Sequence, residues 1–321
     1  MRTAPADPAA PALLRRPAAP ACMLVQVTTE AAAEFASHRS RLFSLAYRML
    51  GSASEAEDVV QDTYLRWSAA DHRAVRSPAA WLTRAATNLC LNRLNSARAQ
   101  RESYVGPWLP EPVFTRGAAG ELGPLETAEQ RESVSLALLT LMERLTPAER
   151  AVFVLREAFG HSHREVAGVL GVEEAHSRQL LRRARERLGS APRFDVDDAQ
   201  RRAIVERFLA AALEGDVAGL ERLLAGDVVA WTDGGGRTTA ARRPIAGRAK
   251  VVRYFLGMGI RPEAARIEVE YAEVNGEPAA VVRDGGELRA VVAPEIRAAR
   301  ISAVRTVVNP AKLAFAARQT A

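Results

Sequence analysis

The residue types that carry catalysis or bind metal ions are distributed in a way that favours binding over catalysis. All five histidines precede residue 199, and they are His38, His72, His161, His163 and His176. The only cysteines, Cys22 and Cys90, lie far apart in the sequence, so they suggest neither a disulfide framework nor a metal-ligand cluster. We therefore expect no catalytic residue, no metal site and no cofactor, in a protein that is not an enzyme by itself.

The clearest chemical signal is an arginine-rich stretch between Thr146 and Leu188. Residues 146–149 (TPAE) and 162–165 (SHRE) have the pattern of capping boxes, which start successive helices. Gly171 provides a tight turn before a last helix that we expect to begin near Glu173. In that helix an apolar stripe with spacings of three and four, ending at Leu188, predicts a buried side. This order of elements predicts a helix-turn-helix that binds duplex DNA.

The opposite side of that last helix carries side chains that suit DNA. A polar tip near the start of the helix suits base-edge contacts, and the arginines behind it suit phosphates. The predicted contact residues are His176, Ser177, Arg178, Gln179, Arg182, Arg183 and Arg185. The alternative is a solvated basic helix on an ordinary bundle, and the two capping boxes with the glycine turn make it less favoured.

Two helices of opposite charge are predicted upstream of this unit. The first is opened by a predicted capping box at residues 54–57 (SEAE) and carries Glu55, Asp58 and Asp62 on one side. The second runs from about residue 81 to 98 and contains arginines but no acidic residue. On it, Asn88 and Asn92 lie one turn apart, so both amides can meet an unstacked base edge. The charges of either helix alone are explained by interaction with the helix dipole or by solubility. An acidic helix followed directly by a basic helix is explained less well in this way.

These segments resemble the extracytoplasmic-function (group 4) sigma factors of bacterial RNA polymerase over about residues 30–190. The resemblance rests on EAEDVVQDTYLRW, SPAAWLTRAATNLCLNRL, LTPAERAVFVLREAFG and REVAGVLGV. It implies that the acidic helix binds the β′ clamp helices of the RNA polymerase core, through Glu55, Asp58, Asp62 and Trp67. It implies that the basic helix, with the loop at about 69–77, engages the −10 promoter element through Arg84, Asn88, Asn92 and Arg93. The helix-turn-helix would read the −35 element.

Two positions depart from that family's pattern. Asn92 stands where a typical member has Asp, and Asn95 stands where it has Arg. These replacements affect the detail of the expected contact with the −10 element.

Residues 102–126 have the composition of a linker, rich in Gly, Pro and acidic residues. Within them the run YVGPWLPEP (104–112) is too apolar for a free spacer. We therefore expect Trp108, Leu109 and Val113 to be buried. A single helix over residues 127–144 then leads into the DNA-binding unit.

The last part of the chain changes character and predicts an α+β cone. Helices at 199–213 and up to 224 come first, and a helix at 247–256 lies between strand-like runs. The predicted strands are Val228–Thr232, Thr238–Ile245, Ile267–Val274, Ala279–Arg283, Leu288–Ala293 and Ala299–Val308, in a strongly curved antiparallel sheet. This part resembles the SnoaL-like (NTF2-like) domain.

Three short motifs narrow the resemblance to the ECF41-type subgroup of sigma factors: WLPEP in the linker, D-G-G-G at 233–236 and a terminal N-P-x-K-L. That subgroup often has Asp where this chain has Ala311. There the SnoaL-like domain acts as a built-in regulator instead of a separate anti-sigma protein. The implied regulatory contact residues are Trp108, Leu109, Pro110, Glu111, Pro112, Asp233, Gly234, Gly235, Gly236, Asn309 and Pro310.

Asp233 is the one candidate acid of the cone, and three interpretations of it remain open. It forms a turn that docks within the chain, it binds a small molecule in the cone, or it takes part in catalysis. For the whole chain the favoured interpretation is a sigma factor regulated in cis. The alternatives are a one-component ligand-sensing helix-turn-helix regulator and an enzyme with an inactive sigma remnant.

Composition agrees with a nucleic-acid partner and with several domains. The chain has 321 residues, a net charge of +6 and 48% hydrophobic residues, with a pI near 9.9. No apolar run is long enough to cross a membrane, so we expect no membrane partner and a cytoplasmic location. The expected parts are a disordered extension (1–29), a sigma-2-like domain (30–101), a linker (102–126), a sigma-4-like domain (127–189), a second linker (190–198) and the SnoaL-like domain (199–321). Translation from Met23 is a further hypothesis.

Overall fold

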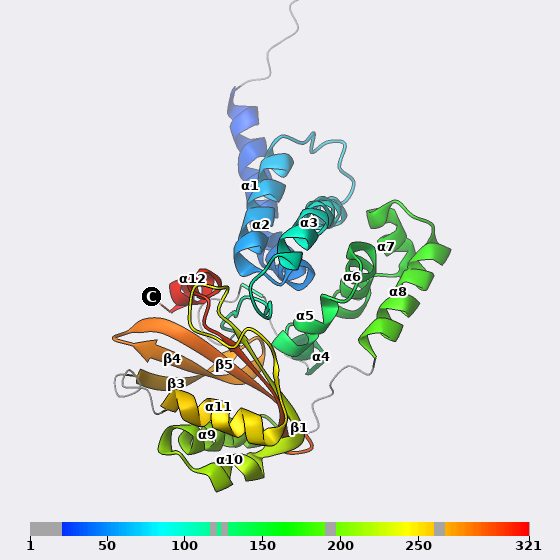
Figure 1. Cartoon of the computed structure of the whole chain (residues 1–321). Coiled ribbons are helices and arrows are strands. Elements are labelled where there is room, and N and C mark those ends of the chain that lie inside the picture. Colours follow the sequence, from blue (N-terminus) through cyan, green and yellow to red (C-terminus); the bar gives the residue numbers. More distant parts are fainter. Residues whose placement is uncertain (1–20, 116–120, 123–127, 190–196, 260–266, 321) are drawn as a thin grey trace, which may run out of the picture.

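The structure is a computed structural model that describes residues 21–115, 121–122, 128–189, 197–259 and 267–320. Two helical domains stand above a curved sheet in Figure 1, and a linker segment (residues 103–115) runs between them and the sheet. Most of the predicted N-terminal extension and parts of both predicted linkers lie outside the described residues. Among the described helices, none combines the length and the apolar character that crossing a membrane requires.

The first helical domain consists of α1 (Ala21–Leu50), α2 (Ala53–Ser68) and α3 (Pro78–Glu102). Helix α1 begins at Ala21, within the predicted extension 1–29. The predicted cap of α2 is wrong. Ser52, not Ser54, caps the helix by accepting a hydrogen bond from the Glu55 backbone N–H.

The second helical domain contains two short helices followed by the helix-turn-helix. Its elements are α4 (Ala128–Glu132), α5 (Leu136–Met142), α6 (Pro147–Phe153), the π-helical turn η1 (Val154–Ala158), α7 (His163–Leu170) and α8 (Glu174–Leu188). Both predicted capping boxes are confirmed, at Thr146 and Ser162. The single helix predicted over 127–144 is wrong, because the Ser135 hydroxyl accepts the Leu138 N–H and starts α5 as a separate helix.

The C-terminal domain is the predicted α+β cone. Its helices are α9 (Asp198–Glu214), α10 (Val217–Leu223), α11 (Arg248–Gly259) and α12 (Pro310–Gln319). Its strands are β1 (Leu224–Asp233), β2 (Ile245–Ala246), β3 (Ile267–Val274), β4 (Glu277–Asp284), β5 (Glu287–Arg297) and β6 (Arg300–Val307). Helix α12, which Asn309 caps and Pro310 begins, was not predicted from the sequence.

The sheet has the order β2-β1-β6-β5-β4-β3 and differs from the prediction in two respects. It is mixed, since β1 and β6 run parallel. The strand predicted over Thr238–Ile245 is almost entirely loop, and only its last residue belongs to β2. Pro244 stands directly before β2 and lacks the N–H that a sheet ladder needs.

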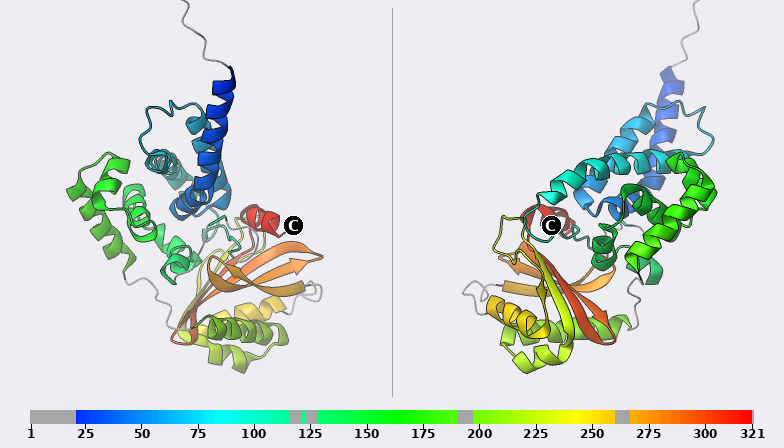
Figure 2. Two further views of the ribbon diagram at one scale, coloured as in Figure 1. Left: turned by 180° about the vertical axis from the view of Figure 1, so that it is seen from behind. Right: turned by 45° about the vertical axis from the view of Figure 1, so that its right-hand side comes forward.

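The two faces of the sheet have different partners. Helices α9, α10 and α11 cover one face, and apolar side chains of α9 and α11 such as Phe208 and Phe255 fill the space beneath it. The other face holds Leu109 and Phe114 of the linker segment together with Leu313 of α12. Seen from two further directions in Figure 2, the sheet separates α9–α11 from α12 and the helical domains. The linker segment and α12 therefore lie between the sheet and the first helical domain.

Candidate functional site

The exposed side of α8 presents most of the predicted DNA-contacting residues to solvent. The exposed ones are His176, Arg178, Gln179, Arg182, Arg183 and Arg185. Three of these arginines pair with acids nearby: Arg178 with Glu174 at 2.5 Å, Arg182 with Glu186 at 3.6 Å and Arg185 with Glu157 at 2.7 Å. Exposed ion pairs of this kind are weak and can exchange for phosphate contacts. The arginines on this side of α8 are therefore accessible to a phosphate backbone.

Ser177 is not part of that surface. Its side chain is buried, and its hydroxyl lies 3.0 Å from His163 Nδ1 on α7. The prediction that Ser177 contacts DNA is therefore wrong. The spacing already contained the signal, because Ser177 precedes the buried Leu181 by four residues and so lies on the same stripe.

The acidic helix and the basic helix are joined by one arginine. Arg93 of α3 lies 3.2 Å from Asp58 and 3.0 Å from Asp62 of α2. Asp58 remains exposed, whereas Asp62 and Glu55 are half-buried. Arg93, which is predicted to contact DNA, thus binds Asp58 and Asp62, which are predicted to contact the polymerase.

Trp67 belongs to the core of the first helical domain. It is buried, its indole N–H donates to the Ala31 carbonyl at 2.8 Å, and its ring lies 5.4 Å from that of Trp81. The prediction that Trp67 contacts the polymerase is therefore wrong as a direct contact. Its position on the apolar side of the helix, one turn after the buried Thr63, was the signal for burial.

The face of α3 that is predicted to engage the −10 element is open. Arg84, Asn88 and Asn92 are all exposed and follow one another at spacings of four residues. The loop of residues 69–77 directly precedes the helix. These side chains form one line along α3, away from its buried residues Leu82 and Leu89.

The linker segment connects the first helical domain to the C-terminal domain. Glu111 is buried against the start of α2, where its carboxylate accepts the Ser52 hydroxyl at 2.7 Å and the Ser54 N–H at 3.0 Å. The Ser54 backbone N–H is one of the groups that a helix start leaves unpaired, so Glu111 acts as an additional cap. This contact explains why Ser54 does not cap α2 itself.

Asp233, at the end of β1, is the centre of a second group of contacts, here called the Asp233 cluster (Tyr104, Leu109, Asp233, Asn309 and Lys312). The Asp233 carboxylate is fully buried and accepts the Tyr104 hydroxyl at 2.5 Å, the Leu109 N–H at 2.8 Å and the Lys312 ammonium at 2.7 Å. Lys312 also donates to the Leu109 carbonyl. Asn309 donates through Nδ2 to the Tyr104 hydroxyl at 2.9 Å.

Burial and the Asp233 carboxylate raise the pKa of Tyr104, so this phenol stays protonated and keeps donating its hydrogen bond. Gly235 has a left-handed φ of 58°. A Cβ at that position would lie 2.2 Å from Asn309 Nδ2 and 3.0 Å from the Tyr104 hydroxyl. The close approach of β1, α12 and the linker segment therefore depends on this glycine.

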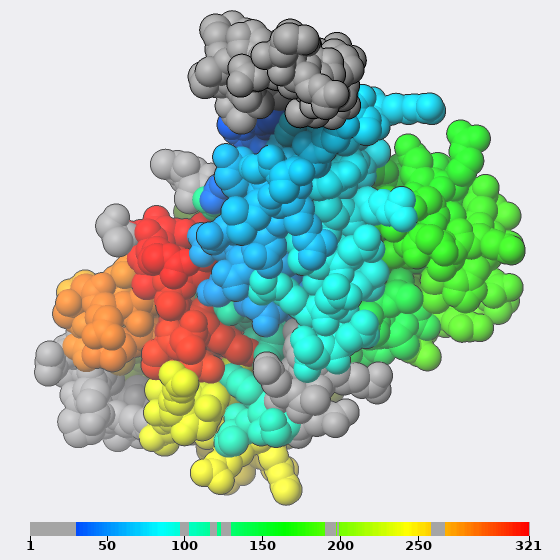
Figure 3. Space-filling view, turned by 90° about the horizontal axis from the view of Figure 1, so that it is seen from above, coloured from blue at the N-terminus to red at the C-terminus, as the bar shows by residue number. Residues whose placement is uncertain are grey.

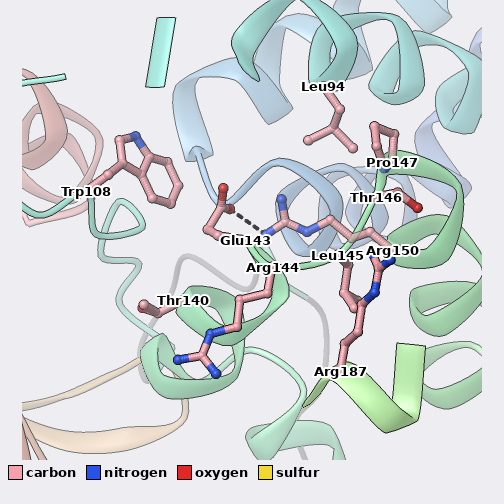
Figure 4. Close-up of a pocket in the computed structure, with 10 residues that line it drawn as sticks. All are labelled: Leu94, Trp108, Thr140, Glu143, Arg144, Leu145, Thr146, Pro147, Arg150 and Arg187. Atoms are coloured by element: carbon pink, nitrogen blue, oxygen red, sulfur yellow. Dashed lines mark hydrogen bonds and ion pairs between the residues drawn. The ribbon is translucent and has the colours of Figure 1, made fainter. Parts of the chain in front are cut away.

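The predicted burial is confirmed for Leu109 and Val113, which are fully buried, and only in part for Trp108, which is half-buried. One face of the Trp108 indole lies 4.0 Å from the Lys312 ammonium, at the distance of a cation–π contact. The ring also borders a cavity of about 390 Å³ between α3 and the second helical domain. In Figure 4 Trp108 points toward that cavity, and Arg150 extends to Glu143 at 2.6 Å. Trp108 thus lies between the Asp233 cluster and this cavity.

Three residues that join the domains were not predicted as contact residues from the sequence. Tyr104 lies in the YVGPWLPEP run and Lys312 in the N-P-x-K-L motif. The sequence therefore contains both residues within motifs but does not show which groups they bind. Asn275 was not singled out at all. Its Asn-Gly dipeptide between two strand-like runs is the usual signal of a tight hairpin turn.

Comparison with known proteins gives matches for both helical domains and for the chain as a whole. Residues 35–100 match Sigma-70 region 2, and residues 135–188 match Sigma-70 region 4. The chain is 37% identical over 290 residues to the ECF RNA polymerase sigma factor SigJ of Mycobacterium tuberculosis, covering 87% of this chain and 92% of that protein. It is 30% identical over 286 residues to the probable ECF RNA polymerase sigma factor SigI of the same species, covering 88% and 94%.

A solved structure agrees with these sequence matches. The crystal structure of Mycobacterium tuberculosis extracytoplasmic function sigma factor SigJ aligns with this chain at a TM-score of 0.71 and 33% sequence identity. The alignment covers 88% of this chain and 98% of that one. The similarity therefore includes the C-terminal domain as well as the helical domains.

Proposed function

The chain belongs to the extracytoplasmic-function family of RNA polymerase sigma factors, and we propose that its C-terminal domain controls this activity within the same chain. As a sigma factor it directs transcription initiation, with RNA polymerase core and promoter DNA as its partners. The alternative of a one-component regulator is not favoured, because both sigma-70 regions are matched in order. We propose that α2 binds the core through Asp58 and Asp62, that α3 engages the −10 element, and that α8 reads the −35 element.

The observation that carries the regulatory proposal is the Asp233 cluster. A buried carboxylate, a buried ammonium and a buried peptide group from three distant parts of the chain satisfy one another there. Removing one partner of such a group leaves a buried charge unpaired, which costs several kcal/mol. The docked arrangement is therefore specific, and losing any one partner should release it.

The position of α12 supports control of polymerase binding. Arg318 of α12 lies 2.6 Å from Glu57 of α2, and Phe315 stacks on Phe43 of α1 at 5.5 Å. The space-filling view in Figure 3 has the C-terminal residues (red) directly beside the first helical domain (blue). These contacts hold α12 beside α2, the helix that we propose binds the core, so the docked form should bind the polymerase less well.

We further propose that the C-terminal domain acts by docking and has no catalytic role. Asp233, its one candidate acid, is occupied by the linker segment and Lys312. No histidine follows residue 199 to serve as a general base. The proposal of a small molecule in the cone receives less support, because the space beneath the sheet is lined by packed apolar side chains.

Transcription in vitro with core polymerase tests the regulatory proposal on the full chain. Lys312→Met removes the ammonium and keeps the length and apolar body of the side chain. Lys250→Met is a matched control, because Lys250 is the only other lysine and lies exposed on α11. We expect Lys312→Met to raise core affinity and promoter output, and Lys250→Met to leave both unchanged. Equal output from all three proteins would contradict regulation through this cluster.

A further inference from the structure

The turn between β3 and β4 inserts one side chain into the place where the other parts of the chain meet. Asn275 is fully buried and uses its amide in three hydrogen bonds. Its Nδ2 donates to the Tyr47 hydroxyl of α1 at 2.6 Å and to the Val134 carbonyl before α5 at 2.7 Å. Its Oδ1 accepts the Val113 N–H of the linker segment at 3.0 Å. One amide thus contacts the first helical domain, the linker segment and the second helical domain.

Backbone atoms of the turn also contact the linker segment and α4. The Asn275 backbone N–H donates to the Val113 carbonyl at 2.9 Å, so the linker segment pairs with the end of β3. The Tyr47 hydroxyl in turn donates to the Glu111 carbonyl at 2.6 Å. Gly276 packs directly on α4, because a Cβ there would lie 2.9 Å from Arg131 Cβ and 3.0 Å from its Cα. The turn therefore admits little displacement of either helical domain.

Only asparagine meets all the requirements of this position. Its φ of 55° is left-handed, which Gly, Asn and Asp adopt most readily. Glycine has no side-chain amide, and aspartate has no N–H to donate. The Val134 carbonyl faces Asn275 at the break between α4 and α5, which Ser135 creates. The turn therefore bonds to the second helical domain at this helix break.

We propose that the Asn275-Gly276 turn positions the two DNA-reading domains relative to each other, as a second interdomain contact distinct from the Asp233 cluster. The proposal rests on the sigma-factor function and on regulation by docking. The Asp233 cluster joins the C-terminal domain to the linker segment, whereas Asn275 also reaches both helical domains. Releasing the Asp233 cluster alone would then leave the second helical domain held by Asn275. Full separation of the −10-reading and −35-reading faces requires that the amide contacts break as well.

The test is the distance between the helical domains in the full chain. Spin labels are placed at two exposed sites, Ala69→Cys after α2 and Glu186→Cys on α8, with Cys22 replaced by serine and the buried Cys90 kept. Asn275→Gly keeps the turn and removes the amide, and Asn275→Asp keeps the shape and removes the N–H donors. Gly285→Asn, in the exposed β4–β5 turn, is the matched control for altering a hairpin.

We expect one narrow distance distribution for the unaltered chain and for Gly285→Asn. Both Asn275 variants should lower the ratio of closed to open molecules by about tenfold or more, because buried partners lose their hydrogen bonds. If an Asn275 variant does not fold, Tyr47→Phe decides by the same criterion, since it removes one of the two Nδ2 acceptors without changing the turn.

The outcomes separate this inference from the function on which it rests. An unchanged distribution in the Asn275 variants, with an altered one in Lys312→Met, overturns the positioning role and leaves regulation by the Asp233 cluster standing. If Lys312→Met changes neither the distribution nor promoter output, the regulatory proposal fails. A broader distance distribution in the Asn275 variants would then still support the positioning role of the turn.

Discussion

Arg93 and Asp62 lie 3.0 Å apart and join the helix that we propose engages the −10 element to the helix that we propose binds the polymerase. Asp58, at 3.2 Å, shares the same guanidinium. Two functional surfaces that the sequence presents as separate thus share an ion-pair network. A polymerase surface that competes for these carboxylates would free Arg93 for a DNA backbone nearby.

This relationship determines how the polymerase contact should be tested. Reversing both charges to arginine would place three cations together and disturb the packing of α2 on α3. Asp58→Asn with Asp62→Asn removes the charges and keeps the shapes, at a cost to stability of about 1 kcal/mol per exposed pair or less. We expect core affinity to fall at least tenfold with little change in Tm. Affinity measured by fluorescence anisotropy that equals the wild-type value would contradict the proposed contact.

Two arginines of α8 should separate sequence preference from affinity. Arg178 lies in the first turns of the helix, where a bidentate contact with guanine discriminates by about 1–3 kcal/mol. Arg178→Ala should therefore flatten the preference at one −35 position. Arg185→Ala should weaken binding to all sequences and lower the salt slope by about 1. Binding of a −35 sequence library at several salt concentrations measures both effects, and uniform losses in both variants would show that the proposed register is wrong.

The linker segment should respond unequally to two alanine substitutions. Leu109 is fully buried among sheet residues, so Leu109→Ala should destabilise the docked form by about 2–5 kcal/mol. Trp108 is only half-buried and contributes a cation–π contact with Lys312 of about 0.5–2 kcal/mol. Trp108→Ala should therefore reproduce only part of the release, measured as core affinity and promoter output. A larger effect at Trp108 than at Leu109 would contradict this ranking.

Glu277 should make stability depend on pH. Burial raises the pKa of Glu277 to about 7, although Arg201 of α9 and Arg305 of β6 favour its charged form. The two other acids that affect it, Glu295 of β5 and Glu132 of α4, oppose that charge. A carboxyl with a raised pKa holds its proton in the folded state after the unfolded chain has lost it, so stability falls as pH rises from about 4.5 to 7.

The matched variant for that prediction is Glu277→Gln, which cannot ionise. Its free energy of unfolding, measured by urea denaturation at a series of pH values, should lack this decline. The difference between the two proteins should therefore grow from about pH 4.5 to 7 and then level off. A constant difference across that range would exclude a raised pKa at Glu277.

Local sequence determined the helix-turn-helix and most of its exposed face. The capping boxes at Thr146 and Ser162 and the stripe that ends at Leu188 depend on groups within a few residues of one another. Such contacts can be predicted because spacing along the chain sets spacing in a helix. The same periodicity, applied more strictly, would have assigned Ser177 to the buried side.

Only the tertiary structure decided which residues join the domains. Ser54 has the type and spacing of a cap, yet Glu111 takes its N–H, 57 positions away. Leu109 and Asp233 are separated by 124 positions, and Tyr47 and Asn275 by 228. Each of these groups had several acceptable partners by chemistry alone. Which partner it obtained depended on burial, because a polar group removed from water must bond to whatever the completed fold places beside it.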